Sequence, residues 1–153
     1  FDFLGELPRS FKEGEMLFVH GSARRPLDEY VFPEDVYNPL KLKHIFELVS
    51  RLCFRGHTHI PGVFTIAPEF VAAAVGPGTT EVRMVLPATK AMINVGSVGQ
   101  PRDNDPRSCY VIVEDFETVR YRRIQYDMKA TCDKIYNIPE LDNFLGDRLL
   151  VGR

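Results

Sequence analysis

Short apolar runs recur along the chain, separated by segments rich in glycine, proline and charged residues. Residues 15 to 20, 52 to 54, 62 to 66, 81 to 86 and 91 to 95 form such runs, each of strand length. The first is apolar without alternation, which predicts a strand buried on both faces. The pattern therefore indicates a sheet whose strands lead into loops.

Helical spacing of apolar residues marks other segments, each opened by a capping residue or a proline. These are residues 39 to 50, opened by Asn38 and Pro39, residues 127 to 136, capped by Asp127, and residues 139 to 149, opened by Pro139. The first of these helices is expected to pack on the sheet.

A hairpin and a long loop complete the predicted elements. The strand-forming runs 108 to 113 and 118 to 125 flank a short polar turn, which predicts an antiparallel hairpin. Residues 23 to 37 carry prolines, charges and aromatic side chains without a period and are predicted to be an extended loop. The sequence therefore predicts one domain over residues 1 to 153, of the mixed α/β (α+β) class, with more strand than helix.

Composition excludes several functions. The chain has 153 residues, of which 44% are hydrophobic, so it can bury one sizeable core. A formal net charge of -2 argues against a protein that coats nucleic-acid backbones or anionic membranes. No apolar run reaches the ~18 residues of a membrane span, and no signal-peptide pattern is found. We therefore expect a cytoplasmic protein.

The cysteines agree with that expectation. Cys53, Cys109 and Cys132 lie far apart in the sequence, each within an apolar or helical pattern. An odd, sparse set of cysteines argues against a disulfide framework. We predict buried free thiols in a reducing compartment.

Candidate chemistry concentrates in the segment FRGHTHIP, residues 54 to 61, where His57 and His59 follow a glycine at the end of a predicted strand. Neutral imidazole is the commonest protein ligand for transition metals. His20 ends another predicted strand, and sites in open sheets form beyond the carboxyl ends of strands, so the three histidines converge if their strands are neighbours. The remaining histidine, His44, falls on the polar face of a predicted helix and is expected in solvent.

Two questions stay open at this point. Two histidines one residue apart occur in several hydrolase classes, and the metallo-β-lactamase pattern is disfavoured because Pro61 and Gly62 stand where it requires an aspartate and a histidine. His20, taken alone, fits a histidine bonded to a backbone carbonyl as well as it fits a metal ligand.

Three motifs in order carry a family resemblance. VHGS (residues 19 to 22), GHTHIP (56 to 61) and NVGSVGQPRDNDPR (94 to 107) resemble the C-terminal half of a calcineurin-like metallophosphoesterase. The nearest look-alikes are compact bacterial and archaeal phosphodiesterases and their protein-phosphatase-like relatives. The resemblance runs along essentially the whole chain and departs at Val95, where the family usually has proline.

The resemblance implies a two-sheet β-sandwich flanked by helices, the αββα metallophosphoesterase fold, and hydrolysis of a phosphodiester or phosphomonoester. It implies that His20 and His57 bind one divalent metal ion and His59 a second. Such donors suit Mn, Fe, Zn or Ni, and the sequence does not choose among them. No catalytic residue other than these ligands is assigned in the chain.

Arg24 and Arg102 are the candidate substrate-binding residues, because guanidinium groups suit phosphate oxygens and each follows a site motif. For either arginine alone, an exposed loop side chain without such a role is the alternative. Asp103 and Asp105 either orient Arg102 or form turns in their own loop, and the turn is favoured. A basic strand face is expected in solvent: Arg120, Arg122 and Arg123.

The N-terminal motifs of the family, an Asp-x-His, a Gly-Asp-x-x-Asp and a Gly-Asn-His-Asp/Glu, are absent from this sequence. They supply the remaining ligands, including the carboxylate that bridges the two ions. We therefore predict a dinuclear centre completed by the N-terminal half of the same protein or by another copy of the chain, acting on a phosphorylated small molecule or nucleotide. Without that cover, the apolar faces of Val19, Phe54 and Ile93 are expected to be exposed.

Two alternatives follow from the same residues. One is a non-catalytic or degenerate metallophosphoesterase remnant that acts as a metal-binding or interaction module, with one ion at His20, His57 and His59. The other is a mononuclear three-histidine hydrolase site that is complete in this chain.

Overall fold

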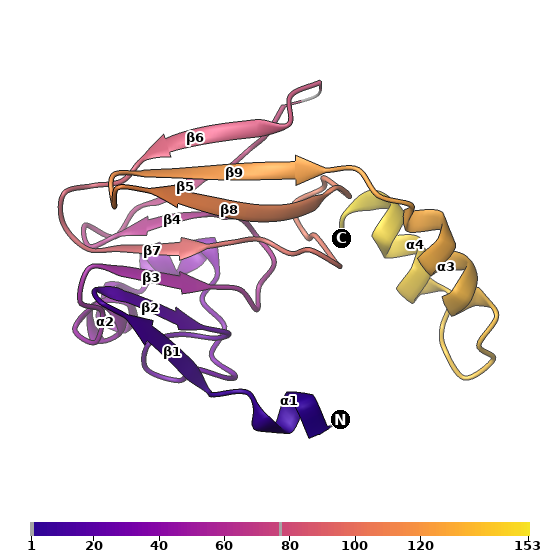
Figure 1. Cartoon of the computed structure of the whole chain (residues 1–153), viewed down its shortest axis with the longest axis horizontal. Helices are drawn as coiled ribbons and strands as arrows, with labels where there is room; N and C mark the ends of the chain where they lie inside the picture. The colour runs from indigo at the N-terminus through magenta and orange to yellow at the C-terminus, as the bar shows by residue number, and fades with distance from the viewer. Residues whose placement is uncertain (1, 77) are drawn as a thin grey trace.

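The computed structural model describes residues 2–76 and 78–153, and within these residues the strands form two sheets that lie face to face (Figure 1). The larger sheet has the order β1-β2-β3-β7-β4-β5. Its strands are β1 (Ser10–Glu13), β2 (Met16–Val19), β3 (Leu52–Arg55), β4 (Gly62–Thr65), β5 (Phe70–Ala72) and β7 (Ala91–Asn94). The smaller sheet has the order β6-β9-β8, formed by β6 (Glu81–Val85), β8 (Ser108–Glu114) and β9 (Thr118–Ile124).

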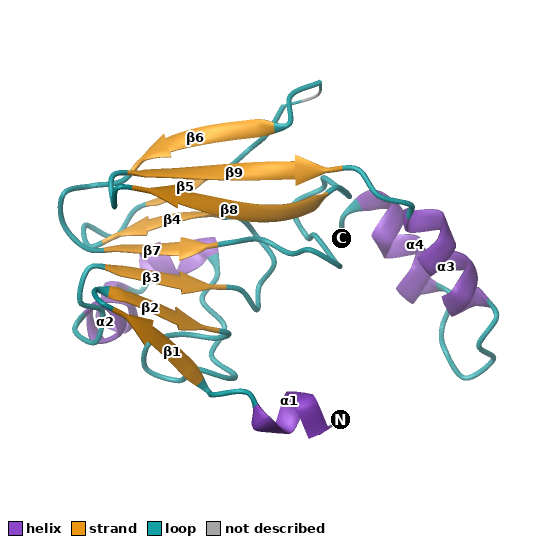
Figure 2. Cartoon of the chain, viewed as in Figure 1, coloured by secondary structure: helices purple, strands orange, loops and turns teal. Residues whose placement is uncertain are grey.

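The helices lie outside this sandwich, as Figure 2 shows. They are α1 (Asp2–Glu6), the 3-10 helix η1 (Pro33–Tyr37), α2 (Pro39–Phe46), α3 (Met128–Tyr136) and α4 (Phe144–Val151). The side chains of Asn38 and Asp127 accept hydrogen bonds from the backbone of Lys41 and Ala130, so both predicted N-caps are confirmed. The mixed α/β class and the antiparallel hairpin of β8 and β9 are also confirmed.

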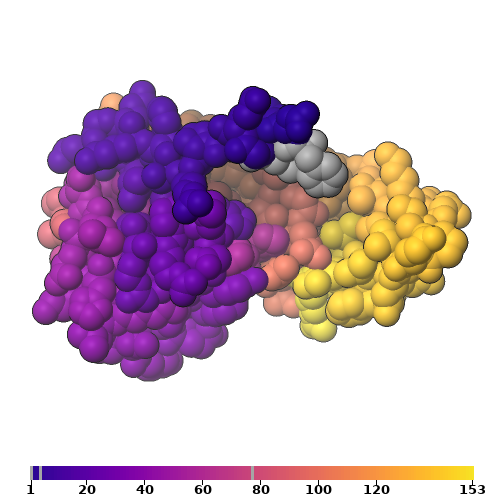
Figure 3. Space-filling view, turned by 90° about the horizontal axis from the view of Figure 1, so that it is seen from below, coloured from indigo at the N-terminus to yellow at the C-terminus, as the bar shows by residue number. Residues whose placement is uncertain are grey.

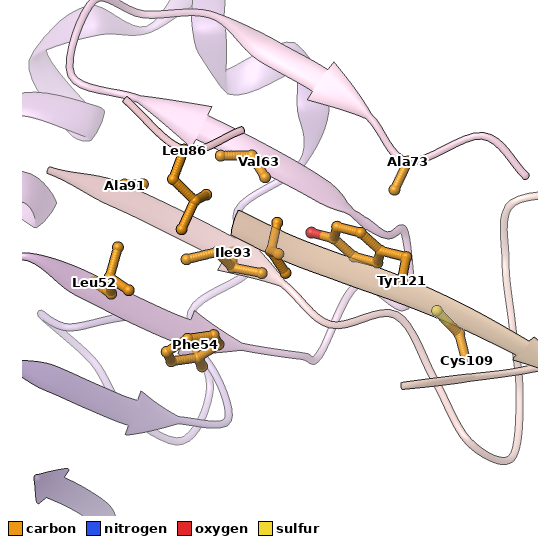
Figure 4. Close-up of a cluster of buried hydrophobic side chains, with 10 residues drawn as sticks. Leu52, Phe54, Val63, Ala73, Leu86, Ala91, Ile93, Cys109 and Tyr121 are labelled. Carbon is orange, nitrogen blue, oxygen red and sulfur yellow. The ribbon is translucent and has the colours of Figure 1, made fainter. Parts of the chain in front are cut away.

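Two apolar clusters hold the layers together. On one face of the larger sheet, α2 packs through Leu42, Ile45 and Phe46, as predicted for that helix. The other face packs against the smaller sheet, with Phe54 and Ile93 in the buried cluster shown in Figure 4. The expectation that these two side chains are exposed is therefore wrong, because β8 and β9 cover them.

The prediction for the first strand also needs correction. All four residues of β2 are half-buried, Val19 among them. The reason is its place near the edge of the sheet, where its outer neighbour is the exposed strand β1. Neither β1 nor β5 was predicted, since Ser10–Glu13 is largely polar and Phe70–Ala72 has only 3 residues.

Two further predictions fail for local reasons. Arg123 is not a solvated side chain but is 2% exposed, because alternation along β9 places it on the inner face with Val119 and Tyr121. The last helix begins at Phe144 rather than at Pro139. At this start the backbone N–H of Phe144 donates a hydrogen bond to the Asp142 carboxylate.

The cysteines are buried and free, as predicted. Cys53, Cys109 and Cys132 are free and buried, and burial raises the pKa of Cys53 to about 12 and that of Cys109 to about 11. Among the described residues, no helix combines the length and the apolar character needed to cross a bilayer.

Candidate metal centre

The predicted site motifs meet at one edge of the larger sheet. The strands β2, β3 and β7 are parallel neighbours, with Phe18 opposite Phe54 and Arg55 opposite Asn94. Their carboxyl ends therefore lie side by side, and the loops that follow them carry the three motifs. Sequence reasoning had predicted this convergence only on condition that the strands are neighbours.

His20 and His57 are in direct contact. The Nε2 atom of His20 lies 2.8 Å from Nδ1 of His57, and the ring centroids are 4.5 Å apart. Two nitrogens that bind one zinc ion at their usual bond lengths are about 3 Å apart, so this pair is close to the spacing of two ligands of one ion. The His20 ring nitrogen is hydrogen-bonded to His57 and not to a backbone carbonyl, so the backbone-carbonyl alternative is not what the structure shows.

His59 is oriented by a different partner. Its Nδ1 atom lies 2.7 Å from the backbone carbonyl of Gln100. Because a carbonyl can only accept, Nδ1 carries the proton and Nε2 keeps its lone pair. A ring nitrogen fixed in this way is the usual support of a metal-ligating histidine. Gln100 contributes through its backbone, so its side-chain identity gave no signal in the sequence.

His59 does not join the other two histidines in one cluster. Within residues 2–76 and 78–153, no group of three or more His, Cys, Asp or Glu side chains is placed to hold a metal ion. A three-histidine site is therefore not assembled in the described part of the chain.

The backbone of this loop is in a conformation that most residues avoid. His57 and His59 have φ angles of 65° and 62°, in the left-handed region. For residues with a side chain this region costs roughly 1–2 kcal/mol each, and such outliers cluster at functional sites. The sequence showed the residues of the turn but not this conformation.

Thr58 and Asn94 hold the turn in place. Both are 1% exposed, and the Asn94 side-chain amide donates a hydrogen bond of 2.6 Å to the Thr58 hydroxyl. The carbonyl oxygen of the same Asn94 side chain accepts from the backbone of Gly96 at 3.0 Å. One buried amide therefore links the histidine turn to the loop that follows β7.

Burial favours the neutral form of the ligand candidates. It lowers the pKa of His57, with the neighbouring His20 acting in the same direction, and it lowers the pKa of His59. Neutral imidazole is the form that binds metal, so the donor set fits a transition-metal ion on chemical grounds.

Tyr30 was missed by the sequence reasoning. Its ring stacks on His57 with centroids 3.8 Å apart, and Phe32 stacks with Tyr30 at 5.4 Å. Both aromatic residues lie in the segment predicted as a loop without a period. No spacing rule relates them to the histidines, so the contact could be found only in three dimensions.

The two candidate arginines have different surroundings. Arg102 follows the Gln100 segment, its backbone N–H donates to the carbonyl of His59 at 3.4 Å, and its Nη2 donates to the Gln100 side chain at 3.1 Å. Arg24 is engaged instead in an ion pair with Glu29, which also accepts from Ser22. The structure thus places Arg102 beside a candidate ligand and holds Arg24 within its own loop.

The loop that contains Arg102 is held by ionic contacts with Arg123 of β9. The buried Arg123 pairs with Asp103 and lies 3.6 Å from Asp105. The Asp105 carboxylate also accepts from the backbone of Arg107 at 3.1 Å, which confirms the predicted turn for that residue. Asp103 was predicted to orient Arg102 or to form a turn, but in the structure it forms an ion pair with Arg123.

A cavity of about 400 Å³ opens at the histidines. It is bounded on one side by His20, His57 and His59, and on the other by Tyr110 and Val111 of β8. The strand β8 is an edge strand of its sheet in the described residues. An edge strand of the smaller sheet therefore lines part of the cavity.

The chain is similar to known proteins over almost its whole length. No protein-family model matches the chain. Uncharacterized protein MJ0912 of Methanocaldococcus jannaschii is 33% identical over 162 residues, which cover 99% of this chain and 59% of that protein. The crystal structure of a metallophosphoesterase from Sphaerobacter thermophilus is 29% identical with a TM-score of 0.82, covering 99% of this chain and 60% of that one.

A more distant structure agrees in fold. Hypothetical protein PH1004 from Pyrococcus horikoshii is 17% identical with a TM-score of 0.68, over 99% of this chain and 54% of its own length. The chain thus spans between half and two thirds of the length of the relatives that it matches. The predicted resemblance to the C-terminal part of a metallophosphoesterase is confirmed, together with the fold that it implied.

Proposed function

We propose that this chain contributes part of a dinuclear metal centre that hydrolyses phosphodiesters or phosphomonoesters. The observation that carries the proposal is the 2.8 Å approach of His20 Nε2 to His57 Nδ1. These nitrogens share one proton in a hydrogen bond, and an ion that replaces this proton could bind both of them. The likeness to a metallophosphoesterase over 99% of the chain supports the hydrolase superfamily.

In this proposal His20 and His57 hold one ion through those nitrogens, and His59 holds the second through Nε2. Imidazole donors suit Mn, Fe, Zn or Ni. When bound, such a pair of ions neutralises charge on the phosphoryl group and lowers the pKa of water. The Gln100 carbonyl keeps the proton of His59 on Nδ1, so the nitrogen that faces the ion needs no deprotonation.

Arg102 is proposed to bind the phosphoryl oxygens. Its side chain is half-buried, Nη2 donates to the Gln100 side chain, and Nη1 makes no hydrogen bond within residues 2–76 and 78–153. A guanidinium with an unused donor suits a phosphate oxygen. Arg24 would first have to release Glu29, so we assign it the secondary role in substrate binding.

The remaining ligands are proposed to come from the N-terminal half of the same protein, or from another copy of the chain. The chain spans 60% of the length of the metallophosphoesterase that it resembles. A row of aromatic rings runs from the buried Phe54 through Phe18 to Phe11, which is 55% exposed and lies beyond the cover of the smaller sheet. An added segment along the free edge of β8 would cover this row and close the cavity at the histidines.

One observation favours a second candidate function. The contact of His20 with His57 would also suit a non-catalytic metallophosphoesterase remnant, although His20, His57 and His59 do not form a three-ligand cluster within the described residues. Such a module would bind a metal ion or a partner without turnover.

Metal content and turnover of the protein made from its complete coding sequence separate the two. We expect two divalent ions per polypeptide, hydrolysis of bis(p-nitrophenyl) phosphate, and loss of that hydrolysis on treatment with a chelator. Bound metal without turnover of either a phosphodiester or a phosphomonoester would favour the remnant. Absence of bound metal from the complete protein would overturn both.

A further inference from the structure

Arg55 is a buried charged residue that the proposed chemistry does not use. It is the last residue of β3, stands two positions before His57, and is 1% exposed. Its Nε donates to the carbonyl of Gly21 at 2.8 Å, and its Nη1 donates to the carbonyl of Val31 at 2.9 Å. Both acceptors are backbone groups of a single loop.

The two carbonyls that Arg55 binds belong to residues next to His20 and Tyr30. Gly21 directly follows His20, and Val31 directly follows Tyr30. One guanidinium therefore fixes both ends of the loop between residues 21 and 31. The side chains at those ends, His20 and Tyr30, both contact the His57 ring.

Backbone hydrogen bonds and close contacts within the loop restrict its conformation between these two ends. Gly21 N–H donates to the Pro26 carbonyl at 2.6 Å, and Ser22 N–H donates to the Arg25 carbonyl at 3.1 Å. A Cβ atom on Gly21 would lie 2.6 Å from the Arg25 carbonyl oxygen and 2.8 Å from the Glu29 nitrogen. Real Cβ atoms do not approach so closely, and the loop has no slack at this point.

Burying this charge is costly. Desolvation lowers the pKa of Arg55 to about 10, and its hydrogen bonds go to neutral carbonyls. Two divergent donors on a planar group suit this task, since a lysine ammonium would have to reach two separated carbonyls from one atom. Stability alone would be served as well by an apolar side chain at the end of a buried strand.

We propose that Arg55 is a positioning residue for the His20–His57 pair. It holds His20 through Gly21, supports the Tyr30 ring that stacks on His57 through Val31, and is joined to His57 by one intervening glycine. The spacing of the two ligand nitrogens is thereby set before any ion arrives. The inference rests on the proposed function, because it assigns Arg55 to the ion held by these two histidines.

Metal affinity tests the proposal, and Arg51 provides a matched control. Arg51 lies just before β3 at the other end of the strand, and it likewise donates to two backbone carbonyls, those of Thr89 and Phe116. Arg55→Met, Arg55→Lys and Arg51→Met are each made in a His59→Ala background of the complete protein. That background leaves the ion of His20 and His57. Affinity for Co²⁺ is measured by competition with a chromophoric chelator, with the visible spectrum of bound Co²⁺ and the thermal midpoint as further readouts.

We expect both Arg55 variants to bind Co²⁺ about 10- to 100-fold more weakly, with an altered spectrum. Arg51→Met should bind within about 2-fold of its parent even if its thermal midpoint falls equally, since supporting contacts act on the ligands that they touch. Unchanged affinity and spectrum in the Arg55 variants would overturn the proposal, as would failure of both Arg55 variants to fold while Arg51→Met folds. Absence of Co²⁺ binding in the parent would instead refute the proposed function.

Discussion

The Thr58 hydroxyl accepts a hydrogen bond of 2.6 Å from the side-chain amide of Asn94, and both residues are 1% exposed. This bond joins the turn between two candidate ligands to the end of the adjacent parallel strand. The residues on either side of Thr58, His57 and His59, have left-handed backbone conformations.

Removing that acceptor should therefore destabilise the fold. Thr58→Val keeps the shape of the side chain but leaves the buried Asn94 amide with only its longer hydrogen bond of 3.4 Å to the Gly56 carbonyl, and we expect a loss of about 1–3 kcal/mol in the free energy of unfolding. Urea denaturation followed by circular dichroism measures it. Thr58→Ser retains the hydroxyl and should lose less stability than Thr58→Val, and a loss in Thr58→Ser without a loss in Thr58→Val would show that the methyl group, not the hydrogen bond, matters.

The site assignment predicts a contrast between two histidines. His59→Ala should abolish metal-dependent phosphodiesterase activity of the complete protein, because it removes the candidate ligand of the second ion. His44→Ala should leave the activity nearly unchanged, since His44 is exposed on α2, as predicted. Initial rates with a nitrophenyl phosphodiester provide the measurement, and equal effects of the two substitutions would refute the assignment.

Ser97 should act on His59 from a distance. Its hydroxyl accepts from the backbone N–H of Gln100 at 2.9 Å, and the carbonyl of Gln100 orients His59. Ser97→Ala is expected to lower the free energy of unfolding by about 0.5–1.5 kcal/mol and to lower the affinity for the second ion by about 10-fold. Metal titration by calorimetry tests this, and the assignment fails if the affinity of both ions stays at the wild-type value.

The histidine pKa values predict a pH dependence of stability in the metal-free protein. Burial, followed by the effect of His20, lowers the pKa of His57 below the value of about 6.5 that an unfolded histidine has. Above pH ~6.5, His57 is neutral in both the folded and the unfolded chain, so its protonation does not lower the free energy of unfolding. Below pH ~6.5, the unfolded chain binds a proton at His57 and the folded chain does not. The free energy of unfolding therefore falls with decreasing pH until the pKa of His57 in the folded chain is passed. His57→Gln should flatten this decline between pH 7 and pH 5 in urea titrations. A decline as steep as that of the wild type would contradict the prediction.

Several parts of the fold and site follow from the sequence for physical reasons. The apolar runs that become β2, β3 and β7 were recognisable, and parallel neighbours necessarily bring their carboxyl ends to one edge. The histidines that end or follow two of these strands could therefore be assigned to one site. The capped starts of α2 and α3 were recognisable because Asn38 and Asp127 supply acceptors that each helix needs.

The missed parts depend on contacts that local patterns do not encode. Arg55 reaches carbonyls 24 and 34 residues away, and Tyr30 stacks on a ring that lies far along the chain. Arg123 was grouped with its charged neighbours, although strand alternation alone assigns it to the opposite face. His59 depends on the backbone oxygen of Gln100, and a backbone atom leaves no trace in residue identity.

The left-handed conformation of His57 and His59 also restricts how this site can change over evolution. Asparagine and aspartate tolerate this backbone region about as well as histidine does, whereas β-branched and bulky residues do not. Exchange of an imidazole for an amide or a carboxylate is thus open without rebuilding the turn. Because oxygen donors favour Mg²⁺, Ca²⁺ or Mn²⁺ over Zn²⁺, a single substitution could redirect the loop toward a different class of metal while the sheet beneath it stays the same.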